Sequence, residues 1–505
     1  MLIGGLDIGT SGCKFILYDE KGTFQYRAYE EYDVTRQLGK SEIDPDTIWR
    51  SVCHVIKEAV REKGSPKAIG VTSFGESFVL LDQEDEVIMP SMMYTDPRGA
   101  EQCDQIVAAI GEEAMIKAVG VKPHCMYSLP KIMWIRDNHP DAYKRTRKIL
   151  LYQDFVVYRL SGKAQIDYSL ATRTMAFDIR SKCWKAEILQ AAGIPVTYFS
   201  KPVPPGTVAG KVKSTIAAEL GLSEDVLIVT GAHDQPASAL GAGAFDPGAA
   251  VDGTGTVECI TPVFNEIPSN PKLYEAGFPV IPYVFDGTYV CYAVSFTGGA
   301  ALKWYRDNFA KFEADLARRE GKNTYQFLDS KVRPQPTGLL ILPHFTGGGN
   351  PYMDNNSTGA ILGLTLETSG YDIYKALMEG ITYEMRLNME YLEQMGICPD
   401  AITTTGGGAN SPVWLQIKAD ILNKKIIACE AEEVGAMGTC MLAGVGAGIL
   451  PDLKSAAALF VRKGRVYEPN PDNHALYTKY YKRYKKVYSA VKDVFQDKYT
   501  DKEEK

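Results

Sequence analysis

The chain has 505 residues, of which 45% are hydrophobic and 23% are charged, and its formal net charge is −7. This size and composition predict a globular protein of two or three domains, and the negative charge provides no basic surface for nucleic acid. The ten cysteines contain no CxxC pair and the six histidines no HExxH spacing, which favours reduced thiols and argues against a zinc site. No apolar run approaches the length of a membrane span, and the first residues lack the basic region of a signal peptide. We therefore expect a cytoplasmic protein that binds neither nucleic acid nor membranes.

The first distinctive stretch is GLDIGTSGCKFILYDEKG, residues 5–22, which places small, hydroxyl and charged residues between two apolar runs. One interpretation is a β-hairpin, because LIGGLDI and KFILYD have the length of strands and glycine can form the turn. The other is a phosphate-binding turn, in which backbone N–H groups and hydroxyls face an anion and Lys14 adds charge. The stretch alone leaves both interpretations open.

Strand-like and helix-like segments alternate along the chain, which predicts an α/β architecture with sheets covered by helices. In the first third, AIGVTSF and FVLLD are further predicted strands. An amphipathic helix is predicted over residues 44–64, with Asp44 as its cap, Pro45 in its first turn and Gly64 at its end. Near the other end of the chain, YTKYYKRYKKVYSAVKDVFQDKY predicts a packed helix rich in tyrosine and lysine.

A second stretch, AAVDGTGTVECIT at residues 249–261, repeats the form of the first one about half a chain later. In both, an apolar strand runs into Asp and Gly-Thr, and a second apolar strand follows. The pattern predicts a duplicated domain, and chance similarity of two glycine-rich hairpins is the alternative. We place the boundary near residue 245, which gives domains of residues 1–245 and 246–505.

The stretch AITTTGGGANSPVWLQIKADIL has strand–turn–helix form, which places functional groups at the rim of an α/β sheet. A β-branched strand runs into three glycines, and Ser411 and Pro412 suit the cap and the first position of a helix. Three consecutive glycines let the backbone approach a ligand closely, and the helix N-terminus supplies donors. We therefore expect this stretch to bind a nucleotide.

The stretch DVLIVTGAHDQPASALGAG has the same form and delivers His233, Asp234 and Gln235 to the carboxyl end of a strand. Asp234 is either a helix N-cap or a general base in a cleft. For His233 we expect packing or hydrogen bonding in preference to the role of base.

In KAIGVTSFGESFVLLD, Gly75 and Glu76 lie between two predicted strands, and MMYTDPRG places Tyr94, Asp96 and Arg98 a short way downstream. A carboxylate, a hydroxyl and a guanidinium near one another would suit a polyhydroxylated substrate, which needs several fixed hydrogen-bond partners. Solvated loop residues are the alternative interpretation.

Taken together, these stretches resemble the FGGY family of carbohydrate kinases and are most similar to its xylulokinase-type members. The resemblance covers most of the chain. It is carried, in chain order, by DIGTSGCK, SLPKIMWIRDNHP, GAHDQPASALGAG, DGTGTV, FTGGAALKWYRD, TGAILGLTLET, TGGGANSPVWLQIKADIL and EEVGAMGTCMLAGVGAG. The combination of these motifs in one order is more specific than any one of them.

The resemblance implies two actin-like (ribonuclease-H-like) α/β domains with a central cleft for ATP and sugar, and MgATP-dependent phosphorylation of a small sugar or polyol. It implies that Asp234 is the catalytic base and that Asp7 helps to hold Mg²⁺ through water. The residues matching its nucleotide site are Thr10, Ser11, Lys14, Gly253, Thr254, Gly255, Gly299, Lys303, Gly407, Gly408 and Asn410. Those expected to bind substrate are Gly75, Glu76, Asp96, Asp234 and Gln235.

The identity of the substrate depends on the substrate loop. Xylulokinases typically carry Met-His where this chain has Gly75-Glu76, whereas glycerol kinases carry Arg-Glu there and Asp-Gln at the base. Met126, however, falls where glycerol kinases usually have Tyr. We expect a ketopentose such as xylulose first, then an erythritol-like polyol, then glycerol.

Two functions of other classes are the alternatives. A non-catalytic actin-like ATP-binding module would keep both phosphate turns but would not need Asp234 or the Glu76 loop. A sugar-responsive repressor would need a DNA-binding helix pair, which we do not expect ahead of the first turn. The sequence leaves the oligomeric state open, with a homodimer as one of the states considered.

Overall fold

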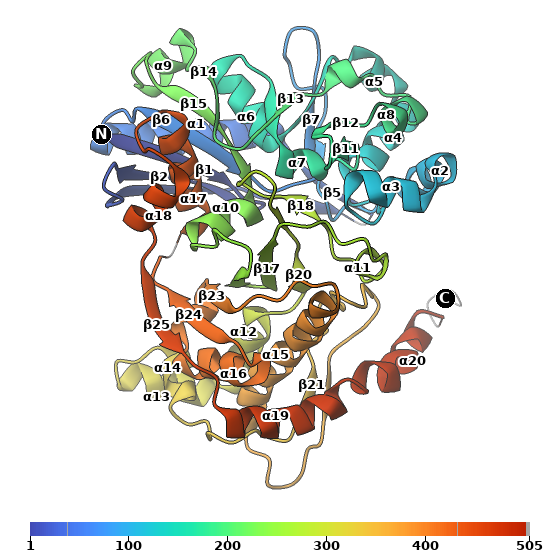
Figure 1. Ribbon diagram of the computed structural model, residues 1–505, viewed down its shortest axis with the longest axis vertical. Helices are drawn as coiled ribbons and strands as arrows, with labels where there is room; N and C mark the ends of the chain where they lie inside the picture. The colour runs from blue at the N-terminus through green and yellow to red at the C-terminus, as the bar shows by residue number, and fades with distance from the viewer. Residues whose placement is uncertain (38, 432, 501–505) are drawn as a thin grey trace. The chain divides into compact units, whose positions relative to one another are not determined.

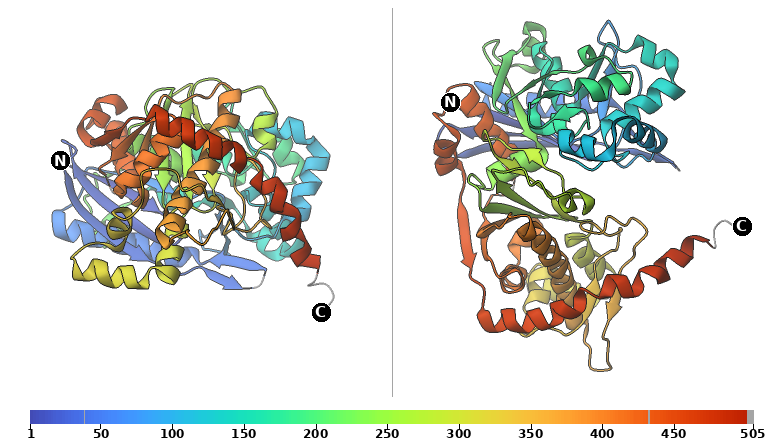
Figure 2. Two further views of the ribbon diagram at one scale, coloured as in Figure 1. Left: turned by 90° about the horizontal axis from the view of Figure 1, so that it is seen from below. Right: turned by 45° about the vertical axis from the view of Figure 1, so that its right-hand side comes forward.

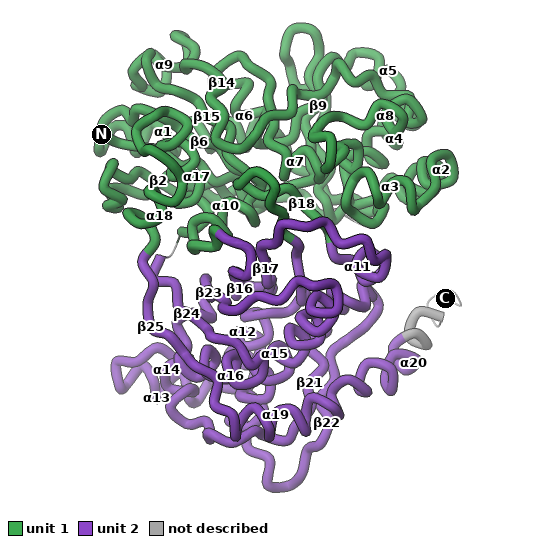
Figure 3. Tube along the Cα trace, viewed as in Figure 1, with its two compact units in different colours: residues 1–245, 279–290, 433–461 green, residues 246–278, 291–432, 462–505 purple. Residues whose placement is uncertain are grey.

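The structure, a computed structural model, describes residues 1–37, 39–431 and 433–500 (Figures 1 and 2). The chain forms two compact units, each built from three segments (Figure 3). Unit 1 comprises Met1–Phe245, Pro279–Val290 and Glu433–Val461. Unit 2 comprises Asp246–Phe278, Cys291–Glu432 and Arg462–Lys505.

A six-stranded sheet forms the centre of unit 1, with the strand order β14-β15-β6-β1-β2-β3. Strand β1 pairs antiparallel with β2 and parallel with β6, which in turn is parallel to β15. The bounds are β1 (Leu2–Ile8), β2 (Gly12–Asp19), β3 (Phe24–Glu31), β6 (Ala68–Ser73), β14 (Thr207–Lys211) and β15 (Leu227–His233). Parallel strands end at one edge of a sheet, so the segments after β1, β6 and β15 are available to build one site.

Helices cover both faces of this sheet. On one face, α1 (Pro45–Lys63) and α6 (Tyr152–Ser161) enclose a core with alternate side chains of the strands, such as Leu6 and Phe15. On the other face, α17 (Val434–Gly446) packs directly on the strands. A Cβ added at Gly5 would lie 2.2 Å from the carbonyl oxygen of Ala436, so only glycine permits this approach.

The division at residue 245 assigned α17 to the second half of the chain, and the structure places it in unit 1. The physical reason lies in its composition. The helix is almost entirely small or apolar, and its residues from Val434 to Gly444 are buried. It finds its partner surface at the glycines of β1 and β6. A glycine-rich sheet face of this kind gives little signal in the sequence.

Unit 2 contains a second sheet whose strands pair in a corresponding order. Its strand order is β17-β16-β23-β24-β25, and β20 pairs with β17. Strand β16 is antiparallel to β17 and parallel to β23, as β1 is to β2 and β6. The bounds are β16 (Ala249–Thr254), β17 (Glu258–Phe264), β20 (Ala293–Ser295), β23 (Ala401–Thr405), β24 (Lys425–Cys429) and β25 (Lys463–Tyr467). Both units therefore have the mixed α/β arrangement that the resemblance predicted.

A second core lies beneath the helices of unit 2. The long helix α15 (Gly370–Gln394) and α16 (Pro412–Leu422) contribute Tyr374, Tyr383 and Trp414 to it. The C-terminal stretch forms two helices, α19 (Pro471–Tyr484) and α20 (Val487–Thr500), where one was predicted. Tyr477, Tyr481 and Tyr484 of α19 are buried in this core, as expected of a packed helix.

Other elements complete the units. Asp44, Pro45 and Gly64 cap, open and end α1 as predicted. The remaining helices are α2 (Ala100–Ile110), α3 (Glu112–Val119), α4 (Ser128–Asn138), α5 (Pro140–Arg145), α7 (Tyr168–Thr172), α8 (Ala186–Ala191), α9 (Ser214–Leu220), α10 (Asp234–Gly241), α11 (Lys272–Glu275), α12 (Gly299–Phe309), α13 (Lys311–Arg319), α14 (Thr324–Asp329) and α18 (Leu453–Phe460). Short strand pairs are β7 (Phe78–Leu81) with β9 (Lys148–Leu151), β10 (Gln165–Asp167) with β13 (Lys201–Val203), and β21 (Leu340–Leu342) with β22 (Ala360–Leu362). Within the described ranges, no helix has the length and apolar character needed to cross a membrane.

Candidate active site

The first glycine-rich stretch is a β-hairpin, and its turn lies between β1 and β2. Gly9 closes it by donating its backbone N–H to the carbonyl of Gly12 at 2.9 Å. Thr10 is half-buried and Ser11 is exposed, so both hydroxyls border solvent. The hairpin interpretation is therefore correct, and the open turn leaves the phosphate-binding role available as well.

Asp7 and Lys14 stand opposite each other across this hairpin. The ammonium of Lys14 lies 3.5 Å from Asp7 Oδ2 and donates to Glu433 Oε2 at 2.7 Å. Arg27 pairs with the other oxygen of Glu433 at 3.1 Å. Burial raises the pKa of Asp7, which Lys14 opposes and Glu433 reinforces. The Lys14 side chain is 27% exposed and is paired with the carboxylates of Asp7 and Glu433, so it remains a cation.

Asp234 is the first residue of α10, directly after β15. His233 occupies the N-cap position, so the interpretation of Asp234 as a mere N-cap is wrong. The Asp234 side chain is 32% exposed, and its Oδ1 lies 3.1 Å from Nε2 of His233. Burial, together with the charge of Arg173, holds the pKa of His233 well below its ordinary value. A neutral imidazole therefore stands beside the carboxylate, and Gln235 follows it, half-buried.

The pKa of Asp234 is raised to about 7. Its desolvation is the largest cause, followed by the negative charges of Asp7 and Glu76, while the N–H of Gln235 and the charge of Arg173 act in the other direction. A carboxylate with a pKa near neutrality is matched to the task of a general base. The structure thus brings three of the predicted residues into electrostatic contact.

Glu76 is held rigidly in the loop after β6. Its φ of 64° lies in the left-handed region, which is unusual for a residue other than glycine. Arg173 donates from Nε to Glu76 Oε1 at 2.6 Å and from Nη2 to the same oxygen, while its guanidinium lies over the ring of Tyr127. Ser128 Oγ donates to the backbone carbonyl of Glu76 at 2.6 Å. The carboxylate is therefore preorganised, at the expense of backbone strain.

Gly75 has no room for a side chain. An added Cβ would lie 3.0 Å from Cγ of Arg173 and 3.0 Å from Nε2 of His233. The arginine stem and the imidazole fill the space that a larger residue at position 75 would need. A residue with a Cβ at position 75 would therefore require the arginine stem or the imidazole to shift.

Asp96 is bonded within the protein on both oxygens. It accepts from the backbone N–H of Ser41 at 2.8 Å and from Nε of Arg98 at 2.8 Å, and Arg98 also pairs with Glu42. The buried ammonium of Lys131 donates to the Asp96 carbonyl. Burial raises the pKa of Asp96, but the hydrogen bonds from Arg98 and Ser41 outweigh it, so the pKa lies below its ordinary value. The Asp96 carboxylate therefore anchors a loop. Its contact with substrate stays a prediction, and the hydrogen bonds that already occupy both oxygens argue against it.

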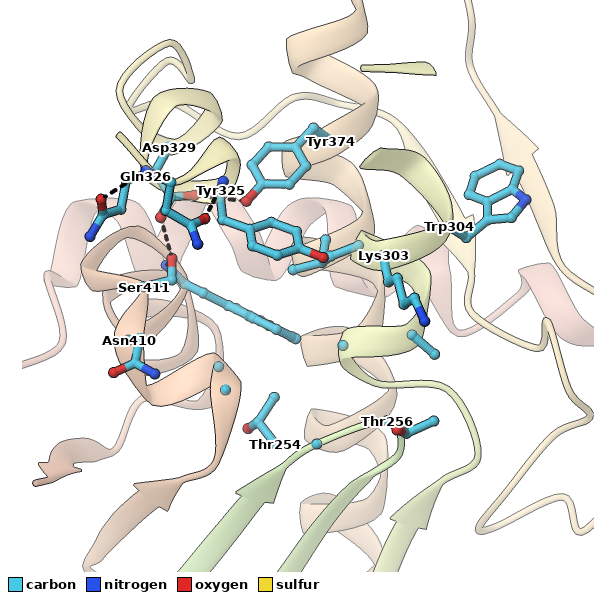
Figure 4. A pocket seen from close by; sticks show the side chains of 18 of the residues that line it. Thr254, Thr256, Lys303, Trp304, Tyr325, Gln326, Asp329, Tyr374, Asn410 and Ser411 are labelled. Atoms are coloured by element: carbon cyan, nitrogen blue, oxygen red, sulfur yellow. Dashed lines mark hydrogen bonds between the residues drawn. The ribbon is translucent and has the colours of Figure 1, made fainter. Parts of the chain in front are cut away.

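Unit 2 contains a cavity of about 1010 Å³ at the carboxyl ends of β16 and β23 (Figure 4). Seven of the eight nucleotide-site residues predicted in this unit line it, and the eighth, Gly253, lies in β16 beside Thr254. The seven are Thr254, Gly255, Gly299, Lys303, Gly407, Gly408 and Asn410. Ser411 and Pro412 cap and open α16 as predicted, so the helix N-terminus lies at the cavity.

The glycines of the two turns leave the backbone open to a ligand. A Cβ added at Gly407 would meet no atom within 4 Å, and one at Gly255 would meet only the Val257 carbonyl at 3.9 Å. Gly255 accepts from the N–H of Gly299 at 2.7 Å, which ties the turn to the start of α12. This is the open, donor-rich backbone that a phosphorylated ligand requires.

Sequence reasoning missed the far wall of this cavity. Figure 4 shows Tyr325 and Tyr374 across the cavity from Thr254. Asp329 accepts from the Tyr374 hydroxyl at 2.9 Å and from Ser411 Oγ at 2.7 Å, which fixes the wall to α16. The lining residues not predicted are Thr256, Ala300, Leu302, Trp304, Asp307, Asn308, Asn323, Tyr325, Gln326, Asp329, Tyr374, Ser411 and Trp414. The capping box at Asn323, which starts α14, was the one local signal available.

Comparison with known proteins agrees with this geometry. The chain is 28% identical over 493 residues to the xylulose kinase of Lactococcus lactis, covering 95% of this chain and 94% of that protein. It is 28% identical over 445 residues to the gluconokinase of Bacillus licheniformis, covering 87% and 86%. The crystal structure of ligand-bound xylulose kinase from Lactobacillus acidophilus has the same fold, with a TM-score of 0.89 at 23% identity over 98% of this chain and 99% of that one.

Family models account for most of the sequence. Residues 2–241 match the N-terminal domain of the FGGY family of carbohydrate kinases, and residues 276–447 match its C-terminal domain. Members of this family transfer phosphate from ATP to a sugar. The chain therefore belongs to the FGGY family of carbohydrate kinases and is a sugar-phosphorylating enzyme.

Proposed function

We propose that this kinase phosphorylates a hydroxyl of a neutral sugar, a ketopentose such as xylulose in the first place, with Asp234 as the general base. The observation that carries the proposal is the carboxylate of Asp234, partly exposed at the start of α10 and with a pKa raised to about 7. Relatives named xylulose kinase that match almost the whole chain support the choice of sugar.

The charges around Asp234 favour a neutral acceptor over an acidic one. Asp7 and Glu76 bear negative charge near this carboxylate, and Arg173 is the cation that acts on it. That cation is already committed to Glu76. A carboxylate-bearing sugar such as gluconate would face net negative charge here, although gluconokinases are among the relatives. Glycerol and erythritol-like polyols are neutral and remain the alternatives within this class.

The proposed step is a direct transfer. Asp234 accepts the proton of the attacking hydroxyl as the new bond from its oxygen to the γ-phosphorus forms and the bond from phosphorus to ADP breaks. Glu76 and Gln235 orient the sugar by hydrogen bonds. The pKa of His233 is held well below its ordinary value, so its imidazole is a weak base and does not compete with Asp234 for the proton.

We propose that ATP occupies the cavity of unit 2, with its phosphates on the turn of Gly253, Thr254 and Gly255 and its adenosine near Gly407, Gly408 and Asn410. Gly299 and Lys303 line the same cavity. In unit 1, Thr10, Ser11 and Lys14 offer two hydroxyls and a cation that suit a phosphate group.

The residues present also fit a Mg²⁺ ion. Asp7 is 14% exposed and keeps a carboxylate oxygen at the first turn. Among the described residues no cluster of three or more His, Cys, Asp or Glu forms a metal site, so Asp7 would share the ion with water and nucleotide phosphates. The bound ion would neutralise phosphate charge during transfer.

A reducing compartment fits the thiols. All ten cysteines are free in the structure, and six of them are buried. We propose on this basis that the enzyme acts in the cytoplasm.

The test is ADP release from MgATP across ketopentoses, hexuloses, aldonates, polyols and glycerol. We expect one strong neutral responder. Asp234→Asn should lower the sugar-dependent rate by roughly 10²–10⁴-fold, the usual contribution of a general base, while ADP still binds. The matched control is Asp225→Asn, which removes an exposed carboxylate paired with Lys211 and should leave the rate unchanged. A near-normal rate for Asp234→Asn would contradict the assignment of the base.

A further inference from the structure

Three ionisable side chains lie buried together beneath the second hairpin, in unit 2. The ammonium of Lys418, on α16, contacts Asp252 Oδ2 and lies 3.1 Å from Glu258 Oε1. Each of the three side chains is 1% exposed. The face of the Trp414 ring lies 4.8 Å from the same ammonium. A cation and two carboxyl groups are thus withdrawn from water at the base of the nucleotide cavity.

Stability is a poor explanation for this cluster. Desolvating charged groups costs several kcal/mol per ion, and apolar residues of similar volume would often fold as well or better. The compensation is incomplete, because Oε2 of Glu258 is buried and has no hydrogen-bond partner within the described part of the chain. Burial raises the pKa of Glu258, and the neighbouring Asp252 raises it further. A cluster retained at this cost points to something that it holds in place.

The residue that it holds is Thr254. Lys418 donates to Thr254 Oγ1 at 2.6 Å, and the Thr254 hydroxyl lies 3.3 Å from Asp252 Oδ1, to which it donates its own proton. Both hydrogen-bonding capacities of this hydroxyl are therefore used inside the protein. The side chain that sequence comparison placed in the phosphate turn is directed inward, and the turn is left with its backbone to offer to a ligand.

Thr254 also separates two glycine turns. A Cβ added at Gly408 would lie 2.4 Å from Cγ2 of Thr254, and one at Gly406 would lie 2.7 Å from its carbonyl oxygen. The threonine therefore packs directly against the turn that precedes α16, while its own backbone continues into Gly255. Any shift of Thr254 would change the spacing between the phosphate turn and the second glycine turn.

We propose that Lys418 is a positioning residue of the nucleotide site, which acts through the hydroxyl of Thr254 to fix the spacing of the Gly253–Gly255 and Gly406–Gly408 turns. The inference rests on the proposed binding of ATP in the unit 2 cavity. Lys418 touches no ligand in this role. Its contribution is to hold two backbone turns, from opposite sides of the cavity floor, at one separation.

The first test compares two buried lysines of unit 2. Lys418→Met removes the proposed positioning contact. Lys375→Met is the matched control, because Lys375 is 2% exposed and donates to the carbonyls of Arg333, Pro334 and Gln335 without lining the cavity. We expect Lys418→Met to weaken ADP binding, measured by calorimetry, at least tenfold. Lys375→Met should change it less than twofold, and the KM for sugar should change less than twofold in both.

A double-mutant cycle tests whether the effect passes through Thr254. Thr254→Val keeps the methyl group and removes the hydroxyl. If Lys418 acts through that hydroxyl, the double variant should bind ADP no more than twofold weaker than the weaker single variant. Independent, multiplicative losses would overturn the proposal, as would a folded Lys418→Met variant that binds ADP as tightly as Lys375→Met does.

If Lys418→Met fails to fold, variants of Thr254 alone test the proposal. Thr254→Ser keeps the hydroxyl that Lys418 engages and Thr254→Val does not, so the serine variant should bind ADP at least fivefold more tightly than the valine variant. The reverse order would contradict the proposal. ADP binding by the unmodified protein is measured beforehand, since its absence would refute the nucleotide site itself and not the role of Lys418.

Discussion

The two glycine-rich hairpins have the same topology but obtain their positive charge in different ways. In unit 1, Asp7 on β1 stands directly opposite Lys14 on β2. In unit 2, Asp252 on β16 stands opposite Ile260, and its cation comes from Lys418 on a helix far along the chain. In both hairpins a lysine thus pairs with the aspartate. In the first hairpin the lysine comes from the partner strand, and in the second it comes from outside the hairpin.

This difference decides what each cation can do. Lys14 is 27% exposed and can exchange its carboxylate partners for a phosphate, whereas Lys418 is 1% exposed and sealed beneath the turn. Burial alone would lower the pKa of Lys418, but Asp252 and Glu258 outweigh it and keep the side chain charged. We therefore expect the first hairpin to act through an accessible cation and the second through the geometry of its backbone.

Among changes to the two hairpins, removing the partly exposed cation should have the largest effect on the KM for ATP. Lys14→Ala should raise the KM for ATP by about 10- to 100-fold, the range of a charge-assisted hydrogen bond worth about 1.5–3 kcal/mol, and change the KM for sugar far less. Steady-state kinetics at varied ATP gives the result. Lys57→Ala is the control, because that lysine is a surface residue paired with Glu219.

Salt sharpens the same prediction. An exposed cation is screened by added salt and a sealed one is not, so the penalty of Lys14→Ala should shrink between 0.05 and about 0.5 M salt. The penalty of Lys418→Met should stay constant over that range. An unchanged apparent affinity for ATP in Lys14→Ala would contradict a direct contact with phosphate.

A pair of glycine variants tests the geometric role of the second hairpin. Gly408→Ala would press its Cβ against Thr254 Cγ2, at 2.4 Å in the present backbone, and overpacking of this kind costs about 1–3 kcal/mol. We expect a lower Tm and roughly tenfold weaker ADP binding. Gly407→Ala meets no atom within 4 Å and should leave Tm unchanged. Equal Tm values for the two variants would show that Thr254 is not a rigid spacer.

Local patterns predicted the elements of the site well. The strand of residues 401–405, its three glycines and the cap at Ser411 lie where the pattern places them, because strand, turn and helix start are decided by neighbouring residues. The same is true of Asp234 at the end of β15. The hairpin of Asp7 was also recognisable, although two interpretations were offered as alternatives and the structure is compatible with both.

Long-range partners could not be predicted in this way. Arg173, which holds Glu76, and Lys418, which holds Thr254, are separated from their partners by 97 and 164 residues. Lys418 lies in a buried, largely apolar part of α16. A charged residue at such a position contradicts the hydrophobic pattern of the helix, and only its partners in the fold explain it. The return of α17 to unit 1 depends likewise on glycines in strands that lie hundreds of residues earlier.

Glu258, which stands opposite Thr254, gives the prediction with the smallest expected effect. It also distinguishes the second hairpin from the first most clearly. Burial and the charge of Asp252 raise the pKa of Glu258 to about 8, against Lys418, which lowers it. The folded state therefore binds this proton more tightly than the unfolded state does. The stability that this protonation contributes is complete below the unfolded pKa of about 4.5 and is lost as the pH rises through about 8.

Glutamine cannot ionise, so Glu258→Gln should remove this loss. We expect the Tm of the variant to exceed that of the unmodified protein at pH 9 and the difference to shrink towards pH 6. ADP binding should change less than threefold, because Lys418 and Thr254 keep their contact. Glu266→Gln, at an exposed position of the same unit, should follow the unmodified protein at every pH. Parallel Tm profiles for Glu258→Gln and the unmodified protein would mean that Glu258 is already ionised in the fold, and Lys418 would then balance two full negative charges beneath the phosphate turn.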